Sequence, residues 1–235
     1  MRPYILTRTL LPLDADGVAL SQSLAGAGDL ILNGVLAVNQ TSGYPSALHA
    51  VAVIGDQQRV TIASGGNDSG ITFTIYGTNY QGEPIQETLT GPNAGTVNST
   101  LNYSSVTRVA GSGATVAAVT VGILGTGESQ PLPLDIYTPS SWNTISLEFT
   151  GAANVTVQFT NDNPFGKEEK YGEQGYTPPP VETQGLLWFD FPVAALVGAA
   201  ANVYSDSEIP LRAVRLKNNS GAGTVRMTVT HQSDM

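Results

Sequence analysis

The 235-residue sequence contains no cysteine and only two histidines, His49 and His231. The absence of cysteine excludes disulfides, thiol nucleophiles and zinc–thiolate sites together. The scarcity of histidine removes the residue that most often serves as a general base. The composition fits a protein that is made in a reducing cytosol.

Charge is also scarce, since charged residues make up 12% of the chain, about half the usual share. Acidic residues outnumber basic ones by 19 to 10, which gives a formal net charge of −9. Nucleic-acid binding needs a basic stripe that neutralises phosphates. Lysine occurs only at Lys167, Lys170 and Lys217, so we expect no nucleic-acid partner. A neutral surface instead suits packing against other proteins.

Long apolar runs are missing as well. The N-terminal stretch "MRPYILTRTLLPLDADG" is interrupted by Pro3, Arg8 and Pro12 and contains no signal-peptide core. No other stretch is apolar for long enough to predict a membrane span. We therefore expect no membrane partner.

Short alternating segments fill most of the chain. In "GITFTIY" (70–76) apolar and polar residues alternate, "TNYQGE" forms a turn, and "PIQETLT" (84–90) alternates again. This pattern predicts a β-hairpin. Similar segments punctuated by Gly and Asn predict an all-β, antiparallel fold. The predicted strands of the first half are 18–22, 29–33, 47–54, 58–63, 70–77, 84–90, 97–103, 105–110 and 115–122.

The segment "GTGESQPLPLD" (125–135) concentrates Gly, Ser and Pro where the alternation lapses. It predicts a boundary between two β-sandwich or jelly-roll-like domains, 18–127 and 128–235. The second domain is predicted to contain strands at 142–151, 153–161, 186–191, 210–218 and 223–231. Residues 193–203 are the only stretch that favours a helix, and residues 162–184 form a long polar loop.

Residues 1–17 are predicted to form an extended arm, because Pro3, Pro12 and the "DADG" turn disfavour helix and sheet interior. The arm carries more apolar surface than a free tail tolerates. We expect it to contribute little to the first domain and to lie along a neighbouring subunit. Its interface candidates are Leu6, Leu10, Leu11 and Leu13.

Two further features are candidates for subunit contacts. Tyr171 and Tyr176 lie in the long loop, where they either anchor it or form a glycan-stacking surface. A closing hairpin with the loop "NNSGAG" would place Arg215 opposite Arg226 on the outer face. Its core-facing residues would be Val214, Leu216, Val225 and Met227. Opposed arginines favour an external anion, such as a carboxylate of a neighbouring subunit. The alternative is that Asp206 or Glu208 of the same domain neutralises the pair.

The sequence carries no clear catalytic pattern. His49 lies among apolar residues, His231 ends the last predicted strand, and Ser69 sits in the turn "GNDSG" rather than in a nucleophile elbow. Carboxylates such as Glu83, Glu87 and Asp190 have no fixed separation. The acidic group of Asn161–Asn163 with Glu168 and Glu169 lacks the spacing of a calcium loop. We expect no enzymatic activity, no cofactor and no metal site.

Several segments resemble structural proteins of tailed bacteriophage particles. They are "SLAGAGDLILNGVLA" (23–37), the block 66–97, "VAGSGATVAAVTVG" (109–122), and "WFDFP" followed by "RAVRLKNNSGAGTVRMTVTHQ". Together they cover roughly residues 18–125 and 186–232.

The resemblance implies a non-enzymatic virion component, made in the cytoplasm of a host bacterium and located in the virion. A capsid decoration or cement protein is the primary interpretation. Its implied partners are the major capsid protein or other virion proteins and further copies of the chain. A neck, adaptor or tail accessory protein, a glycan- or receptor-binding module, and an enzyme remain alternatives.

Overall fold

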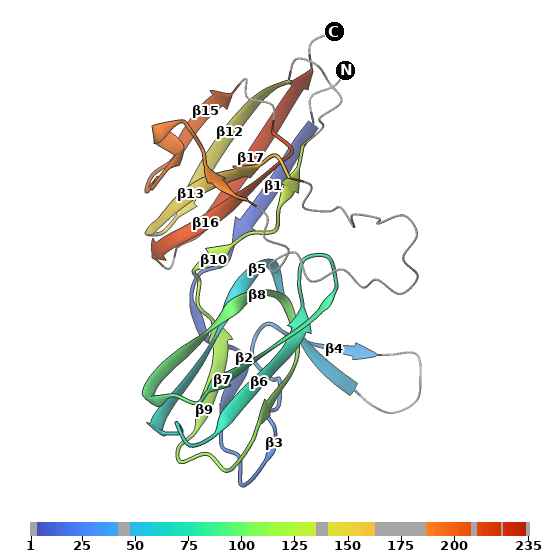
Figure 1. Cartoon of the computed structure of the whole chain (residues 1–235), viewed down its shortest axis with the longest axis vertical. Coiled ribbons are helices and arrows are strands. Elements are labelled where there is room, and N and C mark those ends of the chain that lie inside the picture. The colour runs from blue at the N-terminus through green and yellow to red at the C-terminus, as the bar shows by residue number, and fades with distance from the viewer. Residues whose placement is uncertain are drawn as a thin grey trace. The chain divides into compact units, whose positions relative to one another are not determined.

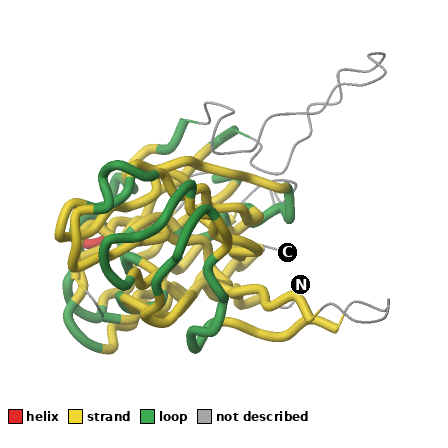
Figure 2. Tube along the Cα trace, turned by 90° about the horizontal axis from the view of Figure 1, so that it is seen from below, coloured by secondary structure: helices red, strands yellow, loops and turns green. Residues whose placement is uncertain are grey.

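The computed structural model describes residues 4–41, 48–134, 141–162, 187–207, 211–221 and 223–233. The protein is all-β, as the sequence predicts, and strands dominate the tube in Figure 2. It divides into two compact units. The N-terminal unit is Pro12–Gly127, and the C-terminal unit combines Met1–Leu11 with Glu128–Met235. The N-terminal unit ends at Gly127, and the second piece of the C-terminal unit begins at Glu128.

The N-terminal unit holds one eight-stranded sheet in the order β2-β9-β5-β8-β6-β7, with β3 on β8 and β4 on β5 (Figure 1). The strands are β2 (Asp14–Gln22), β3 (Gly28–Asp29), β4 (Ala37–Thr41), β5 (Leu48–Asn67), β6 (Thr72–Thr78), β7 (Pro84–Thr90), β8 (Asn93–Gly111) and β9 (Val119–Ile123). β5 and β8 each merge two predicted strands. The β5–β8 register shifts between Val53 and Gln58, where Gly55 has a φ of 77°.

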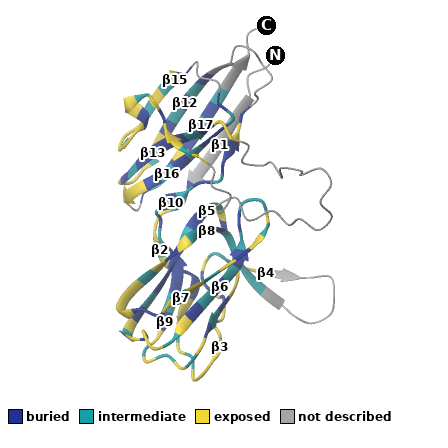
Figure 3. Cartoon of the chain, viewed as in Figure 1, coloured by how far each residue is buried: buried dark blue, intermediate teal, exposed yellow. Residues whose placement is uncertain are grey.

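The predicted hairpin is present. β6 and β7 pair antiparallel from Thr72–Thr90 to Thr78–Pro84. Phe73 and Ile75 are fully buried, while the other face carries threonines, and buried and less buried residues alternate along β6 (Figure 3). The hydroxyls of Thr74 and Thr88 hydrogen-bond across the pair at 3.0 Å. The period-two pattern therefore fixes which face is buried.

The C-terminal unit holds two sheets that share one core. The four-stranded sheet has the order β1-β17-β12-β15, and the second has the order β10-β16-β13-β14 with β11 on β16. Their bounds are β1 (Tyr4–Leu10), β10 (Gly127–Glu128), β11 (Leu132–Pro133), β12 (Ser141–Thr150), β13 (Ala153–Thr160), β14 (Phe189–Asp190), β15 (Val203–Ser207), β16 (Ala213–Gly221) and β17 (Thr224–Ser233).

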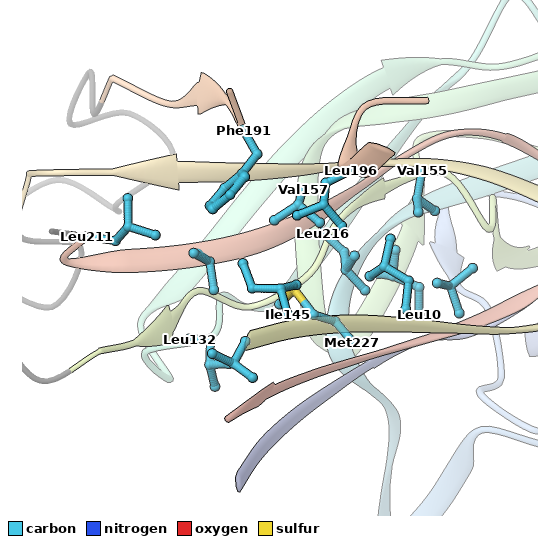
Figure 4. Packing of buried hydrophobic residues seen from close by; sticks show 14 of the residues in the cluster. Leu10, Leu132, Ile145, Val155, Val157, Phe191, Leu196, Leu211, Leu216 and Met227 are labelled. Atoms are coloured by element: carbon cyan, nitrogen blue, oxygen red, sulfur yellow. The ribbon is translucent and has the colours of Figure 1, made fainter. Parts of the chain in front are cut away.

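The core of this unit draws side chains from both sheets, as Figure 4 shows. Its buried members include Leu10, Leu132, Ile145, Leu147, Val155, Val157, Phe191, Leu196, Leu211, Val214, Leu216, Val225, Met227 and Val229. Both sheets of this unit therefore bury apolar side chains in one core. The finer sandwich or jelly-roll topology stays a prediction.

Residues 4–10 of the predicted extended arm (1–17) form a strand of the chain's own sheet, where the sequence predicts no sheet pairing. β1 pairs antiparallel with β17 along seven residues, from Tyr4–His231 to Leu10–Val225. Asp14 already begins β2 of the other unit. The two prolines bracket the segment rather than interrupt it, and the stretch between them can make ladder hydrogen bonds at a sheet edge. The arm therefore contains a strand of the C-terminal unit's own sheet.

The helix predicted at 193–203 is also wrong. The structure has only a 3₁₀ turn, η2 (Ala194–Leu196), flanked by extended backbone at Val193 and Val197. Gly198 has a φ of 65°, and Ala199 forms an isolated bridge with Val155 of β13. Backbone pairing with β13 overrides the helical propensity of the alanines. The predicted loop 162–184 lies, apart from Asp162, outside the described residues.

Candidate functional site

Arg215 and Arg226 are not opposite each other. β16 belongs to the sheet of β13, whereas β17 belongs to the sheet of β12, so the predicted closing hairpin is wrong. Arg215 is paired with Gln158 and Arg226 with Glu148. The chain crosses from one sheet to the other around Gly221, whose φ of 96° favours glycine. The inward residues are those predicted, namely Val214, Leu216, Val225 and Met227, all fully buried.

Arg215 is part of a cluster on the outer face of the second sheet. Its Nε and Nη2 donate to Oε1 of Gln158 at 3.0 and 2.9 Å, and Nη2 lies 4.0 Å from Oε1 of Glu128. Its Cζ lies 4.3 Å from the ring centroid of Trp188, a cation–π distance. Nε2 of Gln158 donates to Oδ1 of Asp190 at 2.9 Å. These contacts hold the segment that carries β14 on the sheet.

Arg226 forms an ion pair with Glu148 on the adjacent strand β12, and both side chains are more than half exposed. An acid of the same unit therefore neutralises Arg226, as in the alternative stated from the sequence. That acid is Glu148, however, and not Asp206 or Glu208. Asp206 instead accepts a hydrogen bond from the hydroxyl of Thr144 at 2.6 Å. Glu208 lies outside the described residues.

The four predicted leucine contacts separate in the structure. Leu10 is fully buried in the core of the C-terminal unit, and Leu11 is partly buried. Leu13 is 49% exposed. Leu6 pairs through its backbone with Val229, and its side chain is not described. Tyr171 and Tyr176 lie outside the described residues, so their predicted role is untested.

The N-terminal unit exposes an apolar set that the sequence reading missed. Its members are Leu20, Ile31, Val35, Val38 and Val53, with exposed fractions between 44% and 82%. We call them the apolar surface. The missed signal is the run "LILNGVL" (30–36), in which Leu30 and Leu32 are buried while Ile31 between them is 67% exposed. An apolar residue on both faces of such a segment indicates a covered or interacting second face.

Hydrogen bonds fix the segments that carry the apolar surface. The side-chain amide of Gln22 accepts from the backbone N–H of Ile31 and donates to its carbonyl, both at 2.8 Å. The backbone N–H of Leu20 donates to Oδ1 of Asn33 at 2.9 Å. The N–H of Val53 donates to the carbonyl of Leu36 at 2.9 Å. The exposed side chains therefore stand on ordered backbone.

The residues considered for catalysis serve local structure. Ser69 donates to Asn67, Glu83 accepts from Asn79, and Glu87 accepts from the N–H groups of Thr100 and Leu101. The side chains of His49 and His231 are not described. Among the described residues no group of three His, Cys, Asp or Glu is placed to hold a metal ion. Within the same residues, no helix has the length and apolarity to cross a membrane.

The protein is thus an all-β protein of two units. The N-terminal unit carries the apolar surface, and the C-terminal unit carries the polar cluster around Arg215 and Trp188. No protein-family model matches the chain, and no curated protein is significantly similar to it.

Proposed function

We propose that the chain is a non-enzymatic structural component of a tailed-phage virion, most specifically a capsid decoration protein. The apolar surface carries the proposal. Five exposed aliphatic side chains on strands and on the hydrogen-bonded segment between β3 and β4 are costly in water and stabilise a complex when a partner covers them. The resemblance to phage structural proteins and the low charge of the chain add independent support.

The apolar surface suits a permanent contact with the major capsid protein. Full burial of one aliphatic side chain contributes roughly 1.5–3 kcal/mol. Ile31 and Val35 are the most exposed members, at 67% and 82%, and gain most on burial. Because hydrogen bonds already order their backbone, little conformational entropy is lost on docking.

Localisation in the particle tests the proposal directly. Gold-labelled antibodies against the recombinant chain should bind the head of particles from the phage that encodes it, and a particle reconstruction should place the chain on the capsid lattice. A ring at the tail axis would instead support the neck, adaptor or tail accessory alternative. Absence of the chain from purified particles would overturn both.

A matched pair of variants tests the surface itself. Ile31→Asp combined with Val35→Asp places charges on the apolar surface, and we expect occupancy on particles to fall at least tenfold. Val116→Asp is the control, since Val116 is 73% exposed in the same unit and is not one of the five side chains that define the apolar surface. Both proteins should keep the wild-type midpoint of unfolding. Equal occupancy of the two variants would contradict the assignment of this surface.

A glycan- or receptor-binding role is the second candidate, favoured by the cluster around Trp188. Its ring stacks on Arg215, and Gln158 and Asp190 supply polar groups beside it. Aromatic rings flanked by polar side chains suit sugar recognition. Binding of the purified chain to host cells or their polysaccharide, lost in Trp188→Ala and kept in the Ile31/Val35 variant, would support this role.

A further inference from the structure

The C-terminal unit is built from two separate pieces of chain. Its larger piece, Glu128–Met235, supplies most of its described strands, and β10 begins one residue earlier, at Gly127. β1 comes from the other piece, the first eleven residues. β1 occupies an edge of the four-stranded sheet and contacts only β17 within that sheet. In Figure 1 it lies beside β17 at the edge of the sheet. An edge strand that pairs with a single neighbour can leave a sheet without breaking any other pairing.

β1 nevertheless supplies part of the core. Leu10 is fully buried among the core residues, and its register partner Val225 is fully buried as well. Without β1, the outer edge of β17 would lose its ladder, and the core would have a gap where Leu10 lies. The remaining piece of the unit is therefore complementary to one particular segment, the sequence of β1.

The connection from β1 to the other unit is short. β1 ends at Leu10 and β2 begins at Asp14, so Leu11–Leu13 form the whole link. Pro12 fixes its own φ and favours an extended conformation for the residue before it. Leu13 is held within the N-terminal unit, where a Cβ on Gly125 would lie 2.5 Å from its backbone nitrogen. Short, stiff links of this kind favour exchange of a terminal strand between copies.

We propose that β1 is exchanged between copies of the chain, so that the first strand of one copy pairs with β17 of another and places its Leu10 in that copy's core. The register and the buried residues are then the same as within one chain, and only the path of Leu11–Leu13 differs. The exchange needs no new interface, because the edge of β17 and the core position of Leu10 already fit the sequence of β1. The idea extends the proposed function, since many copies at high local concentration on a particle would favour linked over single chains.

Engineered cysteines test the exchange in the full-length chain, which has none of its own. Thr7 and Thr228 are register partners across β1 and β17, and antiparallel partners lie about 4.5–5.5 Å apart, within reach of a disulfide. One chain carries only Thr7→Cys and the other only Thr228→Cys. They are mixed unfolded, refolded together at several concentrations and oxidised.

Exchange predicts a disulfide-linked heterodimer whose yield rises with concentration and which reductant dissolves. The double variant Thr7→Cys, Thr228→Cys should likewise give covalent dimers or larger species. The control pair Thr144→Cys, Thr230→Cys joins β12 to β17 within one piece of chain and should always give a monomer.

Monomers alone from the double variant, with no heterodimer from the mixture, would overturn the proposal. No cross-link of either kind would overturn it too, because β1 would then not pair with β17. The experiment uses purified chain only. Its failure therefore leaves the virion role open, and the absence of the chain from particles leaves the exchange open.

Discussion

At the scale of single residues, Asp68 shows how the N-terminal unit uses buried polar groups. Its side chain is 2% exposed, and its carboxylate accepts the hydroxyl of Ser64 at 2.5 Å and the backbone N–H of Val116 at 2.6 Å. A buried carboxylate must have such donors, since it loses its hydration. Asp68 thereby joins the end of β5 to the loop before β9.

We expect Asp68→Asn to destabilise the N-terminal unit by about 1–3 kcal/mol, because an amide replaces one charge-assisted acceptor with a donor. Asp16→Asn is the control, since Asp16 is exposed in the same unit. Urea unfolding followed by far-ultraviolet circular dichroism measures both. Equal midpoints for the two variants would show that Asp68 has no structural role.

Phe73, Ile75 and Ile31 show which burial states can be predicted from the sequence and which cannot. The alternation in "TFTIY" correctly predicts that Phe73 and Ile75 are buried, because a strand has only two faces. The same rule gives no warning for Ile31, which is exposed in a run of apolar residues. Its environment depends on which segments lie beside it, and that is a property of the tertiary fold.

At the scale of elements, the pairing of strands is what the sequence conveys least. Val214, Leu216, Val225 and Met227 face the core whether β16 and β17 form a hairpin or belong to separate sheets. Alternation fixes a face, but it does not identify the neighbour that completes the ladder. The predicted pairing of Arg215 with Arg226 required β16 and β17 to be neighbours, so it was wrong. The prediction of which residues of these strands face the core was right.

β1 gives a prediction at the same scale. Leu10→Ala should destabilise the C-terminal unit by about 2–5 kcal/mol, since it removes a fully buried leucine from the core. Leu13→Ala changes the same residue type three positions away, at a site that is 49% exposed. It should cost less than about 1 kcal/mol. Leu13 belongs to the N-terminal unit, whereas both tryptophans belong to the C-terminal unit. Tryptophan fluorescence in urea therefore measures Leu10→Ala, and far-ultraviolet circular dichroism measures Leu13→Ala. Similar losses would show that β1 is not part of this core.

At the scale of the whole molecule, the two units should unfold separately, since each has its own buried core. Both tryptophans of the sequence, at positions 142 and 188, belong to the C-terminal unit. Fluorescence should therefore follow one transition and circular dichroism two. Asp68→Asn should move only the transition that fluorescence does not detect. A single transition common to both probes would mean that the units unfold cooperatively.

The pairing of β1 with β17 also constrains the order of events during synthesis. β1 is the first of the described strands to leave the ribosome, and β17, its partner, is the last. The N-terminal unit can fold while the ribosome is still translating, but β1 must remain unpaired until β17 has emerged. During that interval, on a polysome where nascent chains lie close together, an unpaired β1 and a newly made β17 from different ribosomes can meet.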